Sequence, residues 1–146
     1  MVSASTDPNT ASWGMAPAHL EFTLTDYQLQ NKFHQPKIYV YPADEYAQIS
    51  SGAAENIRRV KNIVSGAPLS KENMPGVPFF NAGQIIAAHM QAIQFQNGSG
   101  IRMVTEYAQY MAPINNYELV YHFQGLTNDG RYLHSGHSAS HCTNPA

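Results

Sequence analysis

The pattern of apolar and polar positions predicts two strands in the first third of the chain. Residues 20–25 alternate with a period of two, and the β-branched and aromatic run from Ile38 to Tyr41 ends at Pro42. Both patterns are typical of short, half-buried strands. Residues 1–16 mix Ser, Thr, Asn, Asp, Ala and Pro, and we predict a flexible leader there.

The period changes from two to that of a helix at Ala43. Apolar residues then recur at steps of three and four, which places them on one stripe: Tyr46, Ile49, Ala53, Ile57, Val60 and Val64. This spacing predicts one long amphipathic helix with Ile57 and Val60 buried, with a bend expected at Ser51-Gly52 and an end at Gly66. Residues 67–78 carry three prolines and predict an irregular loop.

The second half of the chain has the clearest strand signals. Ile93 and Phe95 lead into a predicted turn at residues 97–100, and residues 101–110 and 117–123 each predict a strand. A strong turn signal at residues 127–130 is followed by Arg131-Tyr132-Leu133. The residues after Leu133 are mostly His, Ser and Gly, so we expect this last strand to stop there and residues 134–146 to form an irregular tail.

These elements predict an α+β fold with the order β-β-α-loop-β-β-β. We expect a mainly antiparallel sheet of about five strands with one long amphipathic helix packed on it. With 146 residues the chain has the usual size of one domain, which we place at residues 17–133. No apolar run reaches the length of about 18–20 residues that a membrane-spanning helix needs.

Charge and cysteine content narrow the range of partners. The formal net charge is −2, and the one basic cluster is Arg58, Arg59 and Lys61 on the predicted helix. Proteins that bind nucleic acids usually concentrate basic residues in a patch, so we expect no nucleic-acid partner. The single cysteine, Cys142, permits no intrachain disulfide. No motif indicates a cofactor, and we expect none.

Three separated motifs carry a family resemblance. They are Pro36 to Pro42 with Glu45-Tyr46, Phe95 to Arg102, and Asn115 to Tyr132 with its Phe-Gln-Gly-Leu-Thr segment. Together the motifs resemble an uncharacterised family of bacterial exported or lipoprotein-anchored domains, over about Pro17 to Tyr132. The resemblance implies an extracytoplasmic location and one globular domain. It assigns no activity and no catalytic residue.

Two features depart from that family. The start of the chain has neither the basic nor the apolar region of a signal peptide, so this chain would be cytoplasmic on expression as given. Family members also end in an apolar strand with prolines, where this chain has His, Ser and Gly. For one permitted choice of codons for residues 132–146, reading shifted by one base encodes such an apolar strand. The tail is therefore interpreted either as native or as a frameshift product.

The tail holds the one candidate metal-ligating set, His134, His137, His141 and Cys142. On a helix, spacings of three and four would place the three imidazoles on one face, and imidazole with thiolate suits zinc. The surrounding Ser and Gly residues form a poor helix. Adventitious binding of zinc or nickel is the alternative interpretation.

Tyrosines give the candidate ligand-binding set, Tyr107, Tyr110, Tyr117 and Tyr121. Such residues can line a groove, because tyrosine offers a large apolar area with a polar end. The alternative is ordinary core and cross-strand packing.

Glu106 and Glu118 form a possible acid–base pair, but their alternating context favours outward-facing polar positions. His89 and His122 are interpreted as structural histidines.

These observations leave the function open between two classes of protein. The first is a non-enzymatic, extracytoplasmic-type domain that binds a ligand or takes part in a surface assembly. The second is a small enzyme whose site comes from several strands, with a metal-binding tail as a further alternative. A final strand that stops at Leu133 would leave residues 117–123 unpaired, which predicts a homodimer through the C-terminal edge of the sheet.

Overall fold

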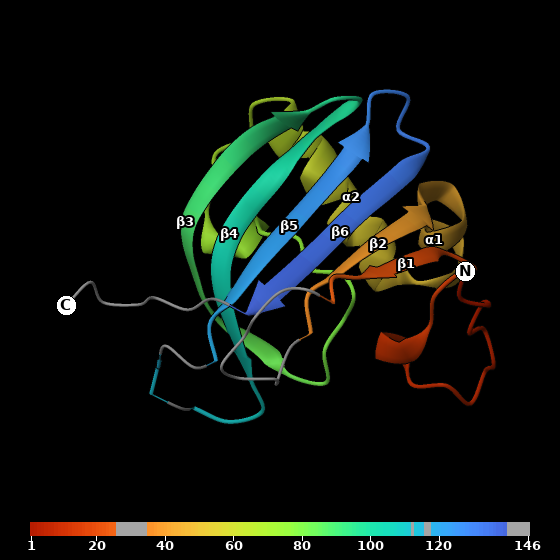
Figure 1. Cartoon of the computed structure of the whole chain (residues 1–146), viewed down its shortest axis with the longest axis horizontal. Coiled ribbons are helices and arrows are strands. Elements are labelled where there is room, and N and C mark those ends of the chain that lie inside the picture. Colours follow the sequence, from red (N-terminus) through yellow and green to blue (C-terminus); the bar gives the residue numbers. More distant parts are fainter. Residues whose placement is uncertain (26–34, 112, 116–117, 140–146) are drawn as a thin grey trace.

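The protein is an α+β domain built on one antiparallel sheet (Figure 1). The computed structural model describes residues 1–25, 35–111, 113–115 and 118–139. Six strands lie in the order β1-β2-β6-β5-β4-β3. Their bounds are β1 (Leu20–Thr23), β2 (Lys37–Pro42), β3 (Gly83–Phe95), β4 (Gly98–Ala108), β5 (Val120–Thr127) and β6 (Tyr132–Ala139). The predicted fold class is confirmed, with six strands where about five were expected.

Both helices lie on the same face of the sheet, which we call the helix face (Figure 1). Helix α1 (Ala43–Ile49) lies near β2, and α2 (Ser51–Val64) packs across β4 and β5. The core between these layers contains Tyr41, Tyr46, Ile101 and Leu133. The other side of the sheet, the open face, has no helix over it in the described part of the chain.

Two helices replace the single long helix that the apolar stripe predicts. Ser50 ends α1 with an extended backbone and caps α2, because its Oγ accepts a hydrogen bond from the Ala53 amide at 3.2 Å. The break lies one residue before the expected bend. Ile57 and Val60 are 5% and 0% exposed, so their predicted burial is confirmed. Gly66, with φ +101°, follows the last turn of α2.

The prediction that the last strand stops at Leu133 is wrong. Strand β6 continues to Ala139 and lies between β2 and β5. The polar residues of β6 can form a strand because the strand pairs through its backbone with β2 on one side and with β5 on the other. Residues 140–146, with His141 and Cys142, lie outside the described residues.

The continued strand also removes the basis of the predicted edge dimer. Strand β5 is paired with β4 on one side and with β6 on the other, so residues 120–126 present no unpaired edge. The edges of the sheet are β1, which has four residues, and β3, which is interrupted by two register shifts. Short and bulged strands are typical of edges that resist strand pairing with another chain.

The predicted leader folds back toward the sheet. Val2 pairs with His19 and Ser5 pairs with Ala16 in isolated antiparallel bridges, and a short 3-10 turn spans Ser12–Gly14. Among the described residues, no helix has the length and apolar character to cross a bilayer.

Candidate functional site

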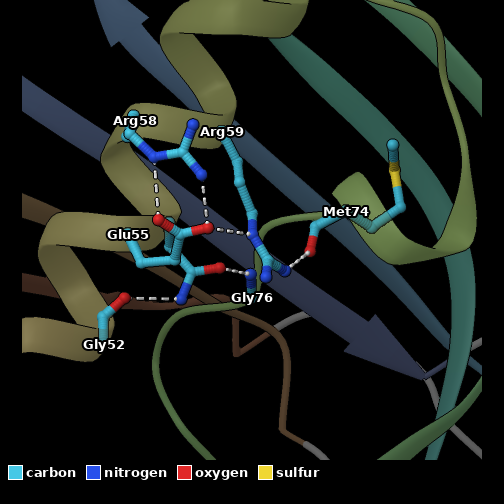
Figure 2. A network of polar contacts seen from close by, with 7 residues as sticks. Gly52, Glu55, Arg58, Arg59, Met74 and Gly76 are labelled. Carbon is cyan, nitrogen blue, oxygen red and sulfur yellow. Dashed lines mark hydrogen bonds and ion pairs between the residues drawn. The ribbon is translucent and has the colours of Figure 1, made fainter.

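Residues 74–80, which we call the strap, cross the helix face beside α2. Asn56 holds the strap, because its Oδ1 accepts a hydrogen bond from the Gly76 amide at 2.8 Å while its Nδ2 donates to the Gly52 carbonyl at 2.8 Å (Figure 2). Arg59 donates to the Met74 carbonyl at 3.2 Å and also pairs with Glu55. These contacts fix the strap over the middle of the sheet.

A buried polar cluster lies beneath the strap. The amide of Gln124 donates to the Val77 carbonyl and to the Ser135 hydroxyl, and that hydroxyl donates to the same carbonyl. Gln124 comes from β5 and Ser135 from β6, and the two residues are register partners. Gln124 and Ser135 therefore connect two central strands to the strap.

His122 lies on the same face, two residues before Gln124. It is 2% exposed, and neither of its ring nitrogens has a hydrogen-bond partner among the described residues. Burial, with a smaller contribution from His137, lowers the pKa of His122 from 6.5 to about 3. His137, its register partner on β6, stacks on Tyr39 with 5.7 Å between ring centroids. His122 is thus a neutral core residue at ordinary pH.

This cluster is part of the closed core and not an open site. His122, Gln124 and Ser135 are at most 2% exposed. Their polar groups are enclosed by the sheet, and the strap accepts hydrogen bonds from two of them. The cluster therefore attaches the strap to the two central strands.

The open face carries a continuous set of apolar side chains. Strand register and alternation place five large ones on it with exposed fractions from 38% to 51%: Leu20, Phe22, Ile38, Tyr121 and Tyr132. Among the described strand residues of this face, Arg102 is the one charged side chain that is exposed. It donates two hydrogen bonds to Oε1 of Gln91 on β3.

Glycines shape the centre of the open face. A Cβ on Gly125 would lie 2.7 Å from the Phe95 ring and 2.8 Å from the Phe123 ring, so aromatic rings cover this glycine. At Gly136 the nearest atom to such a Cβ is the Lys37 carbonyl oxygen at 3.7 Å, and the space above the backbone is open. The result is a shallow hollow of about 270 Å³, which we call the Gly136 hollow. It is lined by Leu24, Lys37, Ile38, Arg102, Tyr121, His122, Phe123, Gly136, His137 and Ser138.

The four predicted ligand-binding tyrosines do not form one site. Tyr121 lines the Gly136 hollow. Tyr107 lies on the helix face against Phe80, with ring centroids 4.7 Å apart, and burial raises its pKa to about 12. Tyr110 is 75% exposed and follows the end of β4. Tyr117 lies outside the described residues.

The predicted metal ligands are separated in the same way. His134 and His137 are three positions apart on β6, so their side chains project from opposite faces of the sheet. His134 lies 5.4 Å from the Phe95 ring on the open face, while His137 packs on the helix face. The described residues contain no group of three or more His, Cys, Asp or Glu side chains arranged to hold a metal ion.

Glu106 differs from its expected outward position. It is 0% exposed, its Oε2 accepts a 3.4 Å hydrogen bond from the Asn115 amide, and its Oε1 has no partner among the described residues. Glu118 accepts from the Asn115 side chain at 2.8 Å. Both glutamates therefore contact Asn115, and the prediction that Glu106 faces solvent is wrong.

Alternation in β5 separates two sets of side chains. Val120, His122 and Gln124 are the buried set, and Tyr121 and Phe123 lie on the open face. Alternation defines the two faces of a strand without saying which face is covered. A sheet covered on one side only leaves the other apolar set exposed.

Comparisons of this chain with protein-family models, with curated proteins and with solved structures find no match. The interpretation of the open face therefore depends on its own geometry and chemistry.

Proposed function

We propose that this protein is a non-enzymatic binding domain whose open face holds a partner, in the extracytoplasmic setting that the family resemblance implies. The observation that carries the proposal is the apolar, charge-poor open face. Contiguous exposed apolar patches on folded domains usually mark interaction surfaces, because water contact with such a patch is unfavourable.

The Gly136 hollow is the concave part of this surface. Ile38 and Phe123 flank the hollow on β2 and β5, and Tyr121 borders it with half of its side chain exposed. An apolar group placed there would contact side chains on three sides. Arg102 adds a cation at the rim.

An enzymatic role has less support among the described residues. Enzyme sites usually combine an open cavity with groups whose pKa is perturbed. Here His122 and Tyr41 have strongly perturbed pKa values, lowered and raised respectively by burial, but both side chains are 2% exposed in the core. His122 is among the residues that line the Gly136 hollow, but with 2% of its surface exposed it offers no accessible group there, and Tyr41 does not line the hollow.

Binding of the fluorescent apolar probe 8-anilinonaphthalene-1-sulfonate tests the proposal. We expect the folded wild-type protein to enhance probe fluorescence, and the double variant Phe22→Ser/Tyr121→Ser to reduce that enhancement severalfold. Tyr110→Ser is the matched control, because Tyr110 is more exposed than Tyr121 but lies beyond the end of β4 and does not line the Gly136 hollow. Thermal unfolding of each variant verifies that the probe meets a folded protein.

The measurement is made at protein concentrations where sedimentation shows a monomer, so that self-association cannot cover the open face. Absence of fluorescence enhancement by the folded monomer would refute the proposal. An equal loss in Tyr110→Ser and in the double variant would refute it as well, because the probe would then bind away from the open face.

A further inference from the structure

We infer that the open face binds the open face of a second copy of this chain, forming a two-fold symmetric homodimer centred on the boundary between β5 and β6. This inference rests on the proposed binding role of the open face and names its partner. It differs from strand pairing at a sheet edge, because the two sheets would stack face to face.

On the open face, the two central strands place large and small residues opposite each other. Across the β5–β6 boundary, Tyr121 is the register partner of Ser138, Phe123 of Gly136, and Gly125 of His134. The first two pairs join a large residue to a small one, whereas the rings of Phe95 and Phe123 cover Gly125. At the levels of Tyr121 and Phe123 the surface is therefore high on β5 and low on β6.

A two-fold axis makes this pattern complementary to itself. When the axis lies in the interface and runs along the β5–β6 boundary, β5 of one copy covers β6 of the other at the same level. Phe123 of each copy then faces Gly136 of its partner, and Tyr121 faces Ser138. Isologous interfaces require this reciprocity between contacting residues. Nearly aligned packing is also a common arrangement of stacked sheets.

Charge does not oppose the stacked arrangement. Arg102 lies on β4, one strand beyond β5, so the axis separates the two copies of Arg102. Three strand spacings of about 4.8 Å and a sheet separation of about 10 Å place them roughly 17 Å apart. That distance exceeds the Debye length of about 8–10 Å at physiological salt. The ion pairs of Glu55 with Arg58 and Arg59 lie on α2, on the helix face.

The size of the face suits a dimer. Five spacings of about 4.8 Å and strands of roughly eight residues give a projected area of about 600 Å². A stable interface buries roughly 800 Å² of accessible surface per partner, and accessible surface exceeds projected area because side chains protrude. Interfaces between identical subunits are also more apolar and poorer in charge than other interfaces, as this face is.

Sedimentation velocity over a micromolar concentration series tests the inference on the full chain. We expect a monomer–dimer equilibrium for the wild type. Tyr121→Lys places a cation near the axis and should raise the dissociation constant at least about tenfold. Tyr110→Lys is the matched control and should dimerise like the wild type.

A second variant tests the large-on-small contact itself. Gly136→Leu keeps the face apolar, and a side chain has room there within one copy because no atom lies closer than 3.7 Å to the added Cβ. In the dimer it would collide with Phe123 of the other copy, so the dissociation constant should rise by a similar factor. The apolar probe should still bind the monomeric variant.

The outcomes separate this inference from the proposed function. A wild type that binds the probe but stays monomeric at all concentrations overturns the dimer and leaves the binding role standing. Association that survives both Tyr121→Lys and Gly136→Leu, with cooperative melting retained, also overturns it. Loss of probe binding by the folded wild-type monomer refutes the binding role and this inference together.

Discussion

The fold changes the chemistry of His122. Its imidazole is neutral in the folded core, where burial lowers its pKa to about 3, whereas an imidazole in an unfolded chain titrates near 6.5. The unfolded state therefore binds a proton between these values that the folded state does not. Stability contributed by neutral His122 is complete above about pH 6.5 and is lost as the pH falls toward 3.

We predict that the free energy of unfolding falls by up to about 2 kcal/mol through His122 between pH 7 and pH 5. Urea unfolding at the two pH values measures it. His122→Leu removes the proton uptake and should flatten the pH dependence. His89→Asn is the control, because His89 is exposed with φ 51°, a conformation that Asn tolerates. An equal pH dependence in His122→Leu and wild type would contradict the assignment.

Asn56 is the residue that holds the strap. Its side chain satisfies one amide of the strap and one carbonyl of α2, and it is 8% exposed. We predict that Asn56→Ala lowers the free energy of unfolding by about 1–3 kcal/mol, since both groups lose a partner in a poorly solvated place.

Chemical denaturation of Asn56→Ala and Glu55→Gln side by side measures this effect. Glu55 makes ion pairs with Arg58 and Arg59 on the exposed surface of α2. Exposed ion pairs contribute little to stability because water and salt screen them, so Glu55→Gln should change the free energy of unfolding little. If Glu55→Gln lowered the free energy of unfolding more than Asn56→Ala does, the attachment of the strap would not depend on the side-chain amide of Asn56.

At the scale of elements, α2 is the element whose sequence pattern and packing agree best. Ile57, Val60 and Ile63 form its buried stripe, and Val64 lies at its exposed end. We predict that Ile57→Ala costs about 2–5 kcal/mol as a core truncation. Val64→Ala, at a side chain 44% exposed, should change the free energy of unfolding by less than about 0.5 kcal/mol. Urea unfolding compares the two variants. Similar losses of unfolding free energy in both would contradict the orientation in which Ile57 is buried and Val64 is exposed.

Strand β6 is the element that sequence patterns described least well. Its helix-face residues include Ser135 and His137, polar side chains that local reasoning places outside a core. Pairing with β2 and β5 and the hydrogen bonds of Ser135 to Gln124 and Val77 accommodate them. Whether residues 134–146 are a frameshift product stays a prediction, which the nucleotide sequence of the gene checks.

At the scale of the whole molecule, β6 joins the two parts of the sheet. It connects β1 and β2 to the meander of β3, β4 and β5. We predict that a chain ending at Leu133 loses cooperative thermal unfolding, because β2 and β5 would lose their shared neighbour. Circular dichroism during heating measures this. A cooperative melt close to that of the full chain would show that the sheet holds without β6.

The sequence by itself determined the elements that depend on short-range periodicity. The period-two run at residues 20–25 predicted β1, and the β-branched and aromatic run at residues 38–41 predicted β2. Steps of three and four predicted the buried face of α2, since side-chain direction repeats regularly along a helix. Turn residues located the connection between β5 and β6, where Gly130 has φ +70°. These features follow from residues close together in the chain.

The tertiary structure decided which strands are central and which side of the sheet is covered. Alternation in β5 is equally compatible with either face, and the position of α2 buried His122 and Gln124 while leaving Tyr121 exposed. The place of β6 depends on pairing with β2, about a hundred residues earlier in the chain. The open face and its hollow exist only because separate strands contribute neighbouring side chains, a relation that local patterns do not encode.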